Sequence, residues 1–428
     1  MTAQQAQVSQ PAKAAKQAQA PTPLLWVAFI GWAVLFIVGI AGVYLRLTEQ
    51  LRPTDLGSYI TWGLWISVDI YFIGLSAGAF LLSSFVYVLR VKALEPLGKL
   101  ALFTAVICLL MAMLSAWFDI GHMERFFYVF IRPNFRSLMT LMIWLYIAYL
   151  ILLLVESWLA LRVDLVKCGQ GSGFKAGLCK FLAFGSADSS EERKEKDHRI
   201  LQILGSVGVV LAITFHGGMG ALFATLIARP FWNGALYPIF FLTGALVSGT
   251  ALVLALAAFL WPRKNEAWQG MLTILSRILL ALLLFDILLE WAEFSAPTWY
   301  GVGHEVELLK TVLFGPYWYV FWIFHILLGA VVPIALIVFR PRSSMALGIA
   351  GTLTVLTYMA VRLNIVIPGL ISPVLPGLDT AFHNNRLKYE YFPTLTEWQV
   401  SLFVAMLGVA LFYVGYKLLP LVSSTEEA

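Results

Sequence analysis

The chain has few charged residues and few cysteines. Of its 428 residues only 12% are Asp, Glu, Lys or Arg, whereas 60% are apolar and the mean hydropathy is +0.83. Soluble domains carry about a quarter charged residues, so this composition excludes a soluble domain and indicates a membrane protein. The three cysteines, Cys108, Cys168 and Cys179, follow no spacing typical of an iron-sulfur cluster or a zinc site, so we expect neither in this chain.

Sequence signatures of soluble enzymes and of nucleic-acid-binding proteins are also missing. There is no Gly-rich phosphate-binding motif after a strand, no Ser-His-Asp arrangement and no nucleic-acid-binding signature. Membrane orientation accounts for the formal net charge of +5. We therefore expect membrane lipids, and not nucleic acid, around this chain.

Long apolar runs dominate the rest of the sequence. They are about 20 to 30 residues long and continuous rather than alternating, which predicts transmembrane helices and not a β-barrel. We predict an all-α polytopic membrane protein with about ten transmembrane helices. The predicted spans are residues 24–45, 58–89, 97–118, 137–161, 200–228, 236–260, 270–292, 315–339, 345–366 and 397–419.

The distribution of Lys and Arg predicts the orientation. Ten spans put both termini on one side, and the segments on that side carry 18 Lys and Arg residues against 10 on the other side. Positively charged loops stay in the cytoplasm, so we expect both termini to be cytoplasmic. The segment 162–199 supplies eight of the 18 and is predicted to be a solvated cytoplasmic connector, and residues 1–23 a disordered cytoplasmic N-terminus.

Two segments of the chain resemble each other at an offset of 171 residues. "WGLWISVDIYFIGLSAGAFLL" (62–82) aligns with "NGALYPIFFLTGALVSGTALV" (233–253). The alignment places Gly63 on Gly234 and Gly78 on Gly249, and the same offset places Asp119 on Glu290 and His122 on Glu293. A chance match between Gly-rich helices is the alternative to a true repeat.

The repeat predicts two parallel four-helix bundles and one peripheral helix at each end of the chain. The first bundle takes residues 58–230 and the second takes residues 231–366. The peripheral helices belong to segments 24–57 and 397–428, and a long periplasmic loop, 367–396, precedes the second of them. A loop of this length is either a lid over the helices or a docking surface for a partner.

Ionisable residues inside the predicted spans are costly in hydrocarbon, so each is a candidate functional residue. A buried side chain with satisfied hydrogen bonds is the alternative for each. Asp69, His216 and His325 are predicted to lie about 15 to 18 Å below the outer face. The set is Asp69, Glu156, His216, Asp286, Glu290, Glu293 and His325, with Glu156 alone near the inner end.

The stretch "AWFDIGHMERFFY", residues 116–128, ends the third span with several ionisable groups. Asp119 and His122 have i, i+3 spacing, which predicts that both lie on one face of a helix end. Such a pair can donate a hydrogen bond to a carbonyl oxygen and pass its proton to water. Glu124 and Arg125 are expected to pair with each other, with lipid headgroups or with a docked partner.

A polar cavity that reaches from one face into the membrane is typical of an ion transporter, a quinone oxidoreductase or a haem protein. In "WGLWISVDIYFIGLSAGAFLL", in "FDIGHMERFFYVFIRPNFRS" and in the paired four-helix pattern, the sequence resembles the NrfD or polysulfide-reductase membrane-subunit family. Ten spans place it nearer the branch with the membrane subunits of alternative complex III, hydrogenase-2 and the periplasmic quinone reductase complex. The resemblance extends from about residue 24 to the end of the chain.

The resemblance implies a haem-free and cluster-free subunit of the bacterial inner membrane that binds menaquinone, in preference to ubiquinone, near the outer face. It implies electron exchange with a periplasmic ferredoxin-like iron-sulfur subunit, which serves a molybdopterin, hydrogenase or multihaem cytochrome subunit. The chain would thus belong to an enzyme complex without being catalytic alone. Asp69 stands where the polysulfide-reductase relative has a quinone-contacting His, and Asp119 with His122 matches the polar junction that the family uses beside the headgroup.

Quinone reduction takes two electrons and two protons, so the site needs hydrogen-bonding groups, a proton route and apolar walls. We expect Asp69, Asp119 and His122 to act on the quinone. Its ring would lie between Trp62, Trp65 and Tyr71, for which an interfacial aromatic belt is the alternative. A proton route along the second bundle would use His216, Asp286, Glu290, Glu293, His325 and Arg362.

Two other functions stay open. His216 and His325 lie at similar depth on different spans, so a haem b membrane anchor that uses both as ligands is one alternative. A secondary transporter or ion-translocating subunit without a redox partner is the other.

Overall fold

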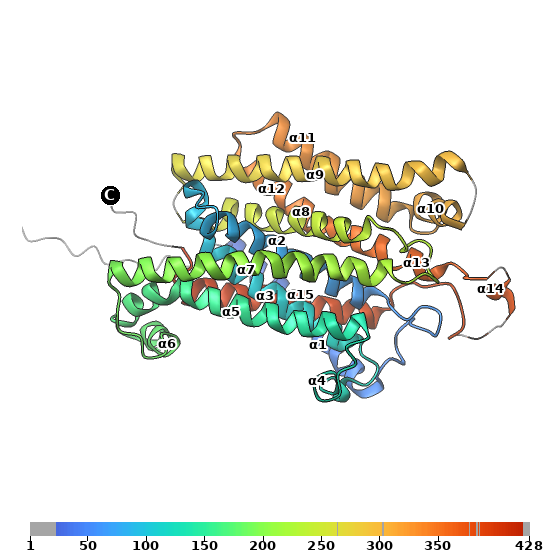
Figure 1. The fold of residues 1–428 in the computed structure, drawn as a ribbon, viewed down its shortest axis with the longest axis horizontal. Coiled ribbons are helices and arrows are strands. Elements are labelled where there is room, and N and C mark those ends of the chain that lie inside the picture. Colours follow the sequence, from blue (N-terminus) through green and yellow to red (C-terminus); the bar gives the residue numbers. More distant parts are fainter. Residues whose placement is uncertain are drawn as a thin grey trace, which may run out of the picture.

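The computed structural model describes residues 23–262, 264–301, 304–375, 377–381, 384 and 386–422. Within these ranges the chain is helical and has no strand, which confirms the all-α polytopic prediction. Residues 1–22, for which the sequence predicts disorder, lie outside the described residues. Figure 1 shows the long helices side by side, with α13 and α14 at one end of the molecule and α6 at the other. The end that carries α13 and α14 is called the outer end below, because the Lys and Arg distribution predicts that it faces away from the cytoplasm.

Ten helices of the described chain are long and apolar enough to cross a membrane. They are α1 (Pro23–Glu49), α2 (Leu64–Tyr87), α3 (Gly98–Asp119), α5 (Leu138–Gly169), α7 (Glu191–Ala224), α8 (Tyr237–Leu260), α9 (Glu266–Tyr300), η3 (Val320–Val331) continued by α11 (Val332–Phe339), α12 (Ser344–Val366) and α15 (Leu395–Leu418). Shorter helices are η1 (Lys92–Leu97), η2 (Met123–Arg125), α4 (Tyr128–Ile131), α6 (Phe174–Leu182), α10 (His304–Phe314), α13 (Pro368–Ile371) and α14 (Leu378–Ala381).

Several helix ends differ from the predicted spans. The helix α2 begins at Leu64 and not near residue 58. The helix α7 begins at Glu191, so the predicted solvated connector 162–199 is helical at both ends. The extension of α7 is polar but favours a helix, because the Ser190 side chain caps its first turn and Arg199 pairs with Glu195 one turn away.

The helices α2 and α8, which the predicted repeat aligns, pack against each other. The helix α2 packs against α3, α7, α8 and α12, and α8 packs against α9, α12, α2 and α7. Where α2 and α8 meet, a Cβ on Gly78 would lie 1.9 Å from the carbonyl oxygen of Ala245, and a Cβ on Gly249 would lie 2.4 Å from the nitrogen of Ala79. The absence of side chains at Gly78 and Gly249 thus permits a close approach of the two helices, and the repeat itself stays a prediction.

The two peripheral helices pack against each other. Trp32 of α1 donates a hydrogen bond to the carbonyl oxygen of Met406 on α15, and the rings of Phe36 and Phe403 stack with centroids 5.3 Å apart. The helix α15 also contacts α3 and α2 of the first bundle. The first and last spans therefore form one pair beside the first bundle.

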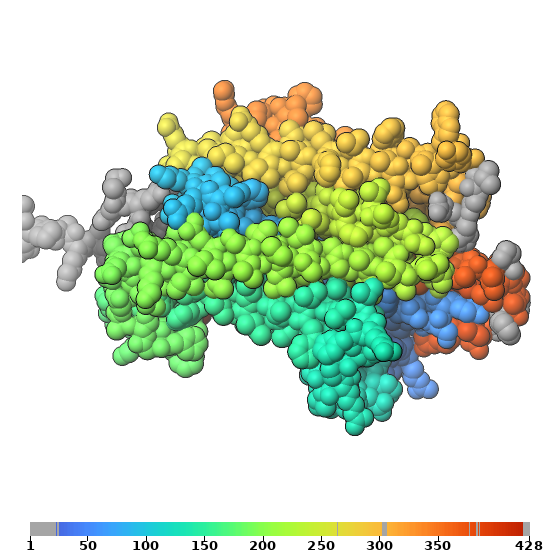
Figure 2. Space-filling model, viewed as in Figure 1, coloured from blue at the N-terminus to red at the C-terminus, as the bar shows by residue number. Residues whose placement is uncertain are grey.

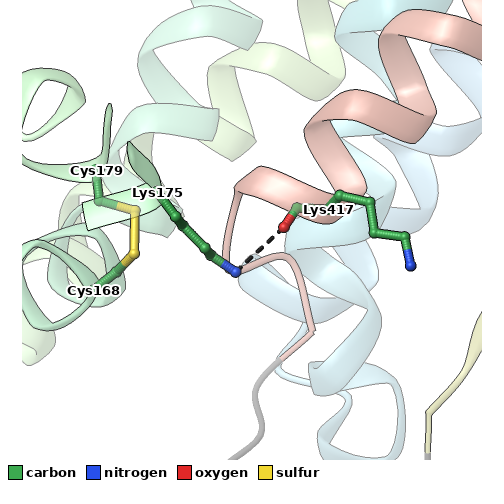
Figure 3. The surroundings of a disulfide bond; sticks show 4 residues. All are labelled: Cys168, Lys175, Cys179 and Lys417. Atoms are coloured by element: carbon green, nitrogen blue, oxygen red, sulfur yellow. Dashed lines mark hydrogen bonds between the residues drawn. A yellow bond between two sulfur atoms is a disulfide. The ribbon is translucent and has the colours of Figure 1, made fainter. Parts of the chain in front are cut away.

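A disulfide joins Cys168 and Cys179 at the end that carries α6. It links the C-terminal end of α5 to α6 across a sequence separation of 11 residues. Lys175 of α6 donates a hydrogen bond of 3.3 Å from its Nζ to the carbonyl oxygen of Lys417 on α15 (Figure 3). The disulfide thus lies beside the junction of α5, α6 and α15.

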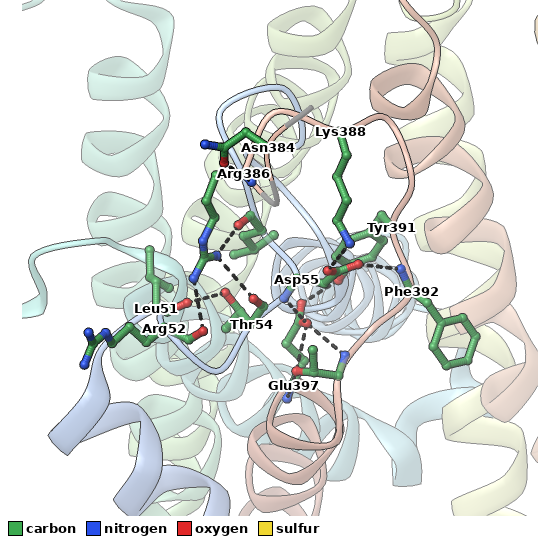
Figure 4. A network of polar contacts seen from close by, with 12 residues as sticks. Leu51, Arg52, Thr54, Asp55, Asn384, Arg386, Lys388, Tyr391, Phe392 and Glu397 are labelled. Carbon is green, nitrogen blue, oxygen red and sulfur yellow. Dashed lines mark hydrogen bonds and ion pairs between the residues drawn. The ribbon is translucent and has the colours of Figure 1, made fainter. Parts of the chain in front are cut away.

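The long loop before α15 is fastened to the first outer loop, as a lid would be. Arg386 donates hydrogen bonds to the carbonyl oxygens of Arg52, Thr54 and Leu56 (Figure 4). Lys388 pairs with the carboxylate of Asp55 at 2.6 Å. Residues 376, 382, 383 and 385 of this loop lie outside the described residues. Figure 2 shows that residues of the η2 and α4 region stand out from the body as a knob near the same end.

Candidate functional site

The helices α2 and α5 bring a carboxyl group and a phenol together inside the first bundle. Asp69 of α2 is 3% exposed, and the hydroxyl of Tyr146 on α5 donates a hydrogen bond of 2.9 Å to its Oδ1. The Tyr146 ring packs edge-on against Phe215 of α7. Sequence reasoning missed Tyr146, because one tyrosine in an apolar span gives no periodic or motif signal.

The buried histidines and Asp69 lie closer to the outer ends of their helices than the sequence predicts. Asp69 is five residues from the start of α2, and His325 is five residues from the start of η3. His216 is eight residues from the end of α7. These positions correspond to about 8 to 12 Å from the helix ends at 1.5 Å per residue, and the depth of 15 to 18 Å below the outer face stays a prediction. The loops before α2 and η3 are apolar, and a hydropathy pattern alone does not separate them from the helices that follow.

Asp119 is the last residue of α3 and lines a cavity of about 840 Å³ at the outer face. Its Oδ1 is fully buried and has no hydrogen-bond partner among the described residues. Asp119 lies within electrostatic range of Asp69. The buried Arg46 of α1 also interacts with Asp119, and it fixes the end of α3 by donating hydrogen bonds to the carbonyl oxygens of Phe118 and Ile120.

His122 does not share a helix face with Asp119, so this geometric expectation is wrong. The helix α3 ends at Asp119, and Ile120 already has extended backbone geometry. The side chain of His122 is 58% exposed, and its Nδ1 lies 3.1 Å from Oε1 of Glu124. Glu124 also lies 3.7 Å from Arg125, as expected, and a local backbone hydrogen bond together with His122 lowers the pKa of Glu124.

The three aromatic residues that we expected around a quinone ring contribute to helix packing. Trp62 lies against Trp232, with ring centroids 5.9 Å apart. Trp65 is buried and donates a hydrogen bond to the carbonyl oxygen of Glu397. The hydroxyl of Tyr71 donates to the carbonyl oxygen of Val355 on α12. None of the three is among the residues that line the cavity beside Asp119, so their contact with a quinone stays a prediction.

His216 lies among helices of the first bundle but within electrostatic range of Arg362, so its place in a proton route along the second bundle stays a prediction. It lies on α7, and its Nε2 is 3.0 Å from the carbonyl oxygen of Ile73 on α2. Its Nδ1 is 3.0 Å from the carbonyl oxygen of Ala212. Both ring nitrogens therefore face backbone oxygens, which leaves neither directed toward a haem iron.

The first bundle also has buried polar groups nearer its inner end than Asp69. Glu156 of α5 is 1% exposed, and its Oε1 has no hydrogen-bond partner in the described chain. The hydroxyl of Tyr149, one to two turns nearer the outer end of α5, has none either. At the inner end Arg162 forms a buried ion pair with Asp197.

The second bundle contains a matching pair of a carboxyl group and a phenol. Tyr358 of α12 donates a hydrogen bond of 2.9 Å to Oδ2 of Asp286 on α9. Arg362 lies one turn beyond Tyr358, is 1% exposed and places its guanidinium 5.2 Å from the ring centre of Phe241. Its Nε and Nη1 have no hydrogen-bond partner among the residues described.

The other residues that we predicted for the second bundle lie close together, between the pair of Asp286 and Tyr358 and the outer face. Glu290, Glu293 and His325 line one cavity together with Asn364. The Nδ1 of His325 lies 3.6 Å from Oε1 of Glu290. The structure therefore brings together Asp286, Glu290, Glu293, His325 and Arg362 as one group, and His216 lies on α7 within electrostatic range of Arg362.

Comparison with known proteins gives a consistent set of relatives. The family model described as polysulphide reductase, NrfD matches residues 54–374. The chain is 37% identical over 397 residues to a selenate reductase subunit of Mesobacillus selenatarsenatis, an alignment that covers 91% of this chain and 93% of that one. It is 24% identical over 425 residues to the menaquinone reductase integral membrane subunit of Nitratidesulfovibrio vulgaris (94% and 93% covered). It is 26% identical over 390 residues to the Hdr-like menaquinol oxidoreductase integral membrane subunit of Archaeoglobus fulgidus (88% and 89% covered).

Proposed function

The chain belongs to the NrfD polysulphide reductase family and is a membrane subunit of an oxidoreductase complex. We propose that it exchanges electrons between membrane quinone and an iron-sulfur subunit docked at the outer face. Two relatives that cover most of the chain carry menaquinone or menaquinol in their names, which supports menaquinone as the quinone. The iron-sulfur subunit would pass electrons to or from a catalytic subunit of the molybdopterin, hydrogenase or multihaem cytochrome class.

The observation that carries this proposal is the arrangement of two acids and a phenol at the outer end of the first bundle. Asp119 opens onto the outer cavity, Asp69 lies within electrostatic range of it, and Tyr146 hydrogen-bonds Asp69. Reduction of one quinone consumes two electrons and two protons, and oxidation of one quinol releases them. In this proposal Asp119 faces the headgroup, and Asp69 and Tyr146 hold the proton that follows the electrons.

Two leucines supply the apolar part of the cavity beside Asp119, whose other lining residues are mostly polar. They are Leu51 and Leu56, and the lid residue Arg386 closes one side of the cavity. The partner that exchanges electrons would dock over this end, where the exposed aromatics Phe126 and Phe127 of the knob lie. Aromatic side chains are enriched in protein interfaces, so the knob is a suitable contact surface.

Proton movement is a second part of the proposal. The inner half of the first bundle offers Tyr149 and Glu156, whereas the buried side chains of the second bundle at that depth are hydroxyls such as Thr250 and Ser276. Asp286 and Glu290 nevertheless lie within electrostatic range of each other in the outer half of the second bundle. We propose that protons reach the first bundle along α5 and that Asp286 affects proton movement from the second bundle.

The test uses the assembled complex and quinol-linked turnover of its catalytic subunit. We expect Asp69→Asn and Asp119→Asn each to lower this turnover about 100-fold, because an amide cannot take up the proton. Activity of the catalytic subunit with a soluble dye should stay as in the wild type. The control is Trp291→Leu, on the exposed face of α9. Wild-type quinol-linked turnover in both acid variants would overturn the proposal.

A further inference from the structure

A second cavity lies at the outer end of the second bundle, among α8, α9, η3 and α12. Its walls are largely apolar and include the aromatic residues Phe231, Tyr237, Phe240 and Phe294. Polar groups reach it from three helices: Glu290 and Glu293 from α9, His325 from η3 and Asn364 from α12. A mostly apolar cavity with a few converging polar groups is the usual form of a small-molecule binding site.

Two side-chain groups in this cavity have no hydrogen-bond partner in the described chain. His325 is 7% exposed, and its Nδ1 lies 3.6 Å from Oε1 of Glu290, which is too far for a hydrogen bond. The Nδ2 of Asn364 is fully buried and is likewise without a partner there. A buried donor that stays unpaired costs about 1 to 3 kcal/mol, so a ligand with acceptor oxygens would stabilise both groups.

An apolar cavity of about 410 Å³ adjoins this one. The two share Val312 and Asn364 in their walls, and the larger one continues along Phe324, Leu356 and Leu363. A ligand in the polar cavity can therefore extend an apolar chain into the adjoining one without leaving the protein. The pair of cavities fits a molecule with a hydrogen-bonding ring and a long hydrocarbon tail.

The charges that line the polar cavity indicate which membrane molecule of that shape fits it, a phospholipid or a molecule with a neutral ring. Its lining has two glutamates and neither Lys nor Arg. A phosphate headgroup would face these carboxylates without a cation, which disfavours a phospholipid. A neutral ring with carbonyl oxygens meets no such repulsion, because its oxygens accept hydrogen bonds from His325 and Asn364.

The backbone at His325 also departs from regular α-helix. The segment Val320–Val331 is π-helical, with His325 in its middle and Pro333 directly after it in α11. Wide π-turns are uncommon and occur frequently at functional sites, because they shift the side chains that follow around the helix axis.

We infer that the second bundle binds its own molecule of isoprenoid quinone, with the ring between Phe294 and Tyr237 and its carbonyl oxygens at His325 and Asn364. This inference rests on the proposed function for the presence of quinone near the subunit, but it concerns a different cavity. The second cavity would bind the quinone without taking part in electron transfer.

The experiment is photolabelling of the assembled complex in nanodiscs with an azido-quinone that carries an isoprenoid tail. Peptides are then mapped by mass spectrometry. We expect label on peptides of α9, η3 or α12 that line the two cavities. His325→Leu should lower this label about tenfold, which corresponds to the loss of one buried hydrogen bond, and Glu290→Gln serves as a second variant that conserves volume. Trp291→Leu, which is next to Glu290 but 67% exposed, should leave the label unchanged.

The outcomes separate this inference from the proposed function. Absence of label from the second bundle of the wild type would overturn the inference, as would full displacement of the label by excess phosphatidylglycerol. Equal labelling in His325→Leu, Glu290→Gln and wild type would overturn the assigned residues. Wild-type turnover of Asp69→Asn with normal labelling of the second bundle would instead overturn the first-bundle site and leave this inference standing.

Discussion

The two bundles contain the same pair of groups in different electrostatic surroundings. In each, a tyrosine hydroxyl from one helix donates a 2.9 Å hydrogen bond to an aspartate on another, Tyr146 to Asp69 and Tyr358 to Asp286. The charged neighbour of Asp69 is a second acid, Asp119, whereas Asp286 also has the cation Arg362 within range. The two aspartates therefore differ in the charge of their second neighbour, and this difference supports the proposed quinone site in the first bundle.

The largest expected effect concerns the contact that holds the bundles together. In Gly249→Val the Cβ would meet the backbone nitrogen of Ala79 at 2.4 Å, and backbone atoms cannot move aside as a side chain can. We expect a destabilisation of about 3 kcal/mol or more and loss of the assembled subunit from the membrane. Immunoblots of membrane fractions measure it. Gly217→Ala is the control, because nothing lies within 4 Å of a Cβ at Gly217. Equal amounts of both variants would contradict the close packing of α2 against α8.

The next effect separates the two aspartates. We expect Asp69→Asn to lower quinol-linked turnover about 100-fold and Asp286→Asn to lower it less than about tenfold, because only the first acid belongs to the proposed quinone site. Proton movement per electron, measured with a pH indicator in proteoliposomes, should fall more than turnover does in Asp286→Asn. If turnover and proton movement of Asp286→Asn both match the wild type, the second bundle has no part in proton movement.

A smaller effect is expected from removal of each phenol. Tyr146→Phe and Tyr358→Phe each delete one hydrogen bond to a buried carboxyl group, which is worth about 1.5 to 3 kcal/mol when the acceptor is charged. Thermal unfolding of the two variants should therefore shift by similar amounts. Quinol-linked turnover should fall about tenfold in Tyr146→Phe and less in Tyr358→Phe. Similar turnover in the two variants would mean that the bundles are functionally equivalent.

The sequence predicts the helices and the candidate acids better than it predicts their partners. Apolar runs are sufficient to predict the ten spans, whereas the packing of α2 against α8 is seen only in the structure. The partners Tyr146, Tyr358 and Arg46 carry no motif, and which acid each contacts depends on the rotation of helices far apart in the chain. The prediction for His122 is wrong because the i, i+3 rule holds only inside a helix, and α3 ends three residues before it.

At the lid, too, local sequence patterns predict the helix start but not the long-range contacts. Glu397 is fully buried and accepts hydrogen bonds from Tyr391 and from the backbone nitrogen of Asp55, which lies 342 residues away in sequence. It also forms a capping box with Thr394 at the start of α15. The capping box can be predicted from the sequence. The contact between Glu397 and Asp55 cannot, because it forms only when two segments that are far apart in the sequence come together in the fold.

The hydrogen bonds of Arg386 fasten the lid to the first outer loop, whereas Phe392 and Pro393 of the same loop line the apolar cavity of the second bundle. A change at Arg386 therefore gives a further way to separate the bundles. Arg386→Ala removes the hydrogen bonds to Arg52, Thr54 and Leu56 and should free the loop. We expect faster cleavage of residues 377–394 by an added protease and a loss of quinol-linked turnover of about threefold to tenfold, since removal of one such group costs about 1 kcal/mol. Photolabelling of the second bundle should not change. The control is Lys310→Ala in α10, whose ion pair with Glu307 is exposed.

The smallest effect on turnover is expected from removal of the disulfide at the inner end. At this end two indicators of membrane orientation disagree. The Lys and Arg distribution places segment 162–199 in the cytoplasm, whereas a disulfide such as Cys168–Cys179 is typical of oxidising compartments. Cys179→Ser should change turnover less than about twofold, because the short loop that the disulfide closes is already held by α5 and α6. Its partner Cys168 then becomes a free, partly exposed thiol, while Cys108 is buried inside α3. A membrane-impermeant maleimide should label Cys179→Ser in inverted vesicles and not in right-side-out vesicles. Labelling from the outside would reverse the orientation of both bundles and place the Asp69 and Glu290 ends on the cytoplasmic side.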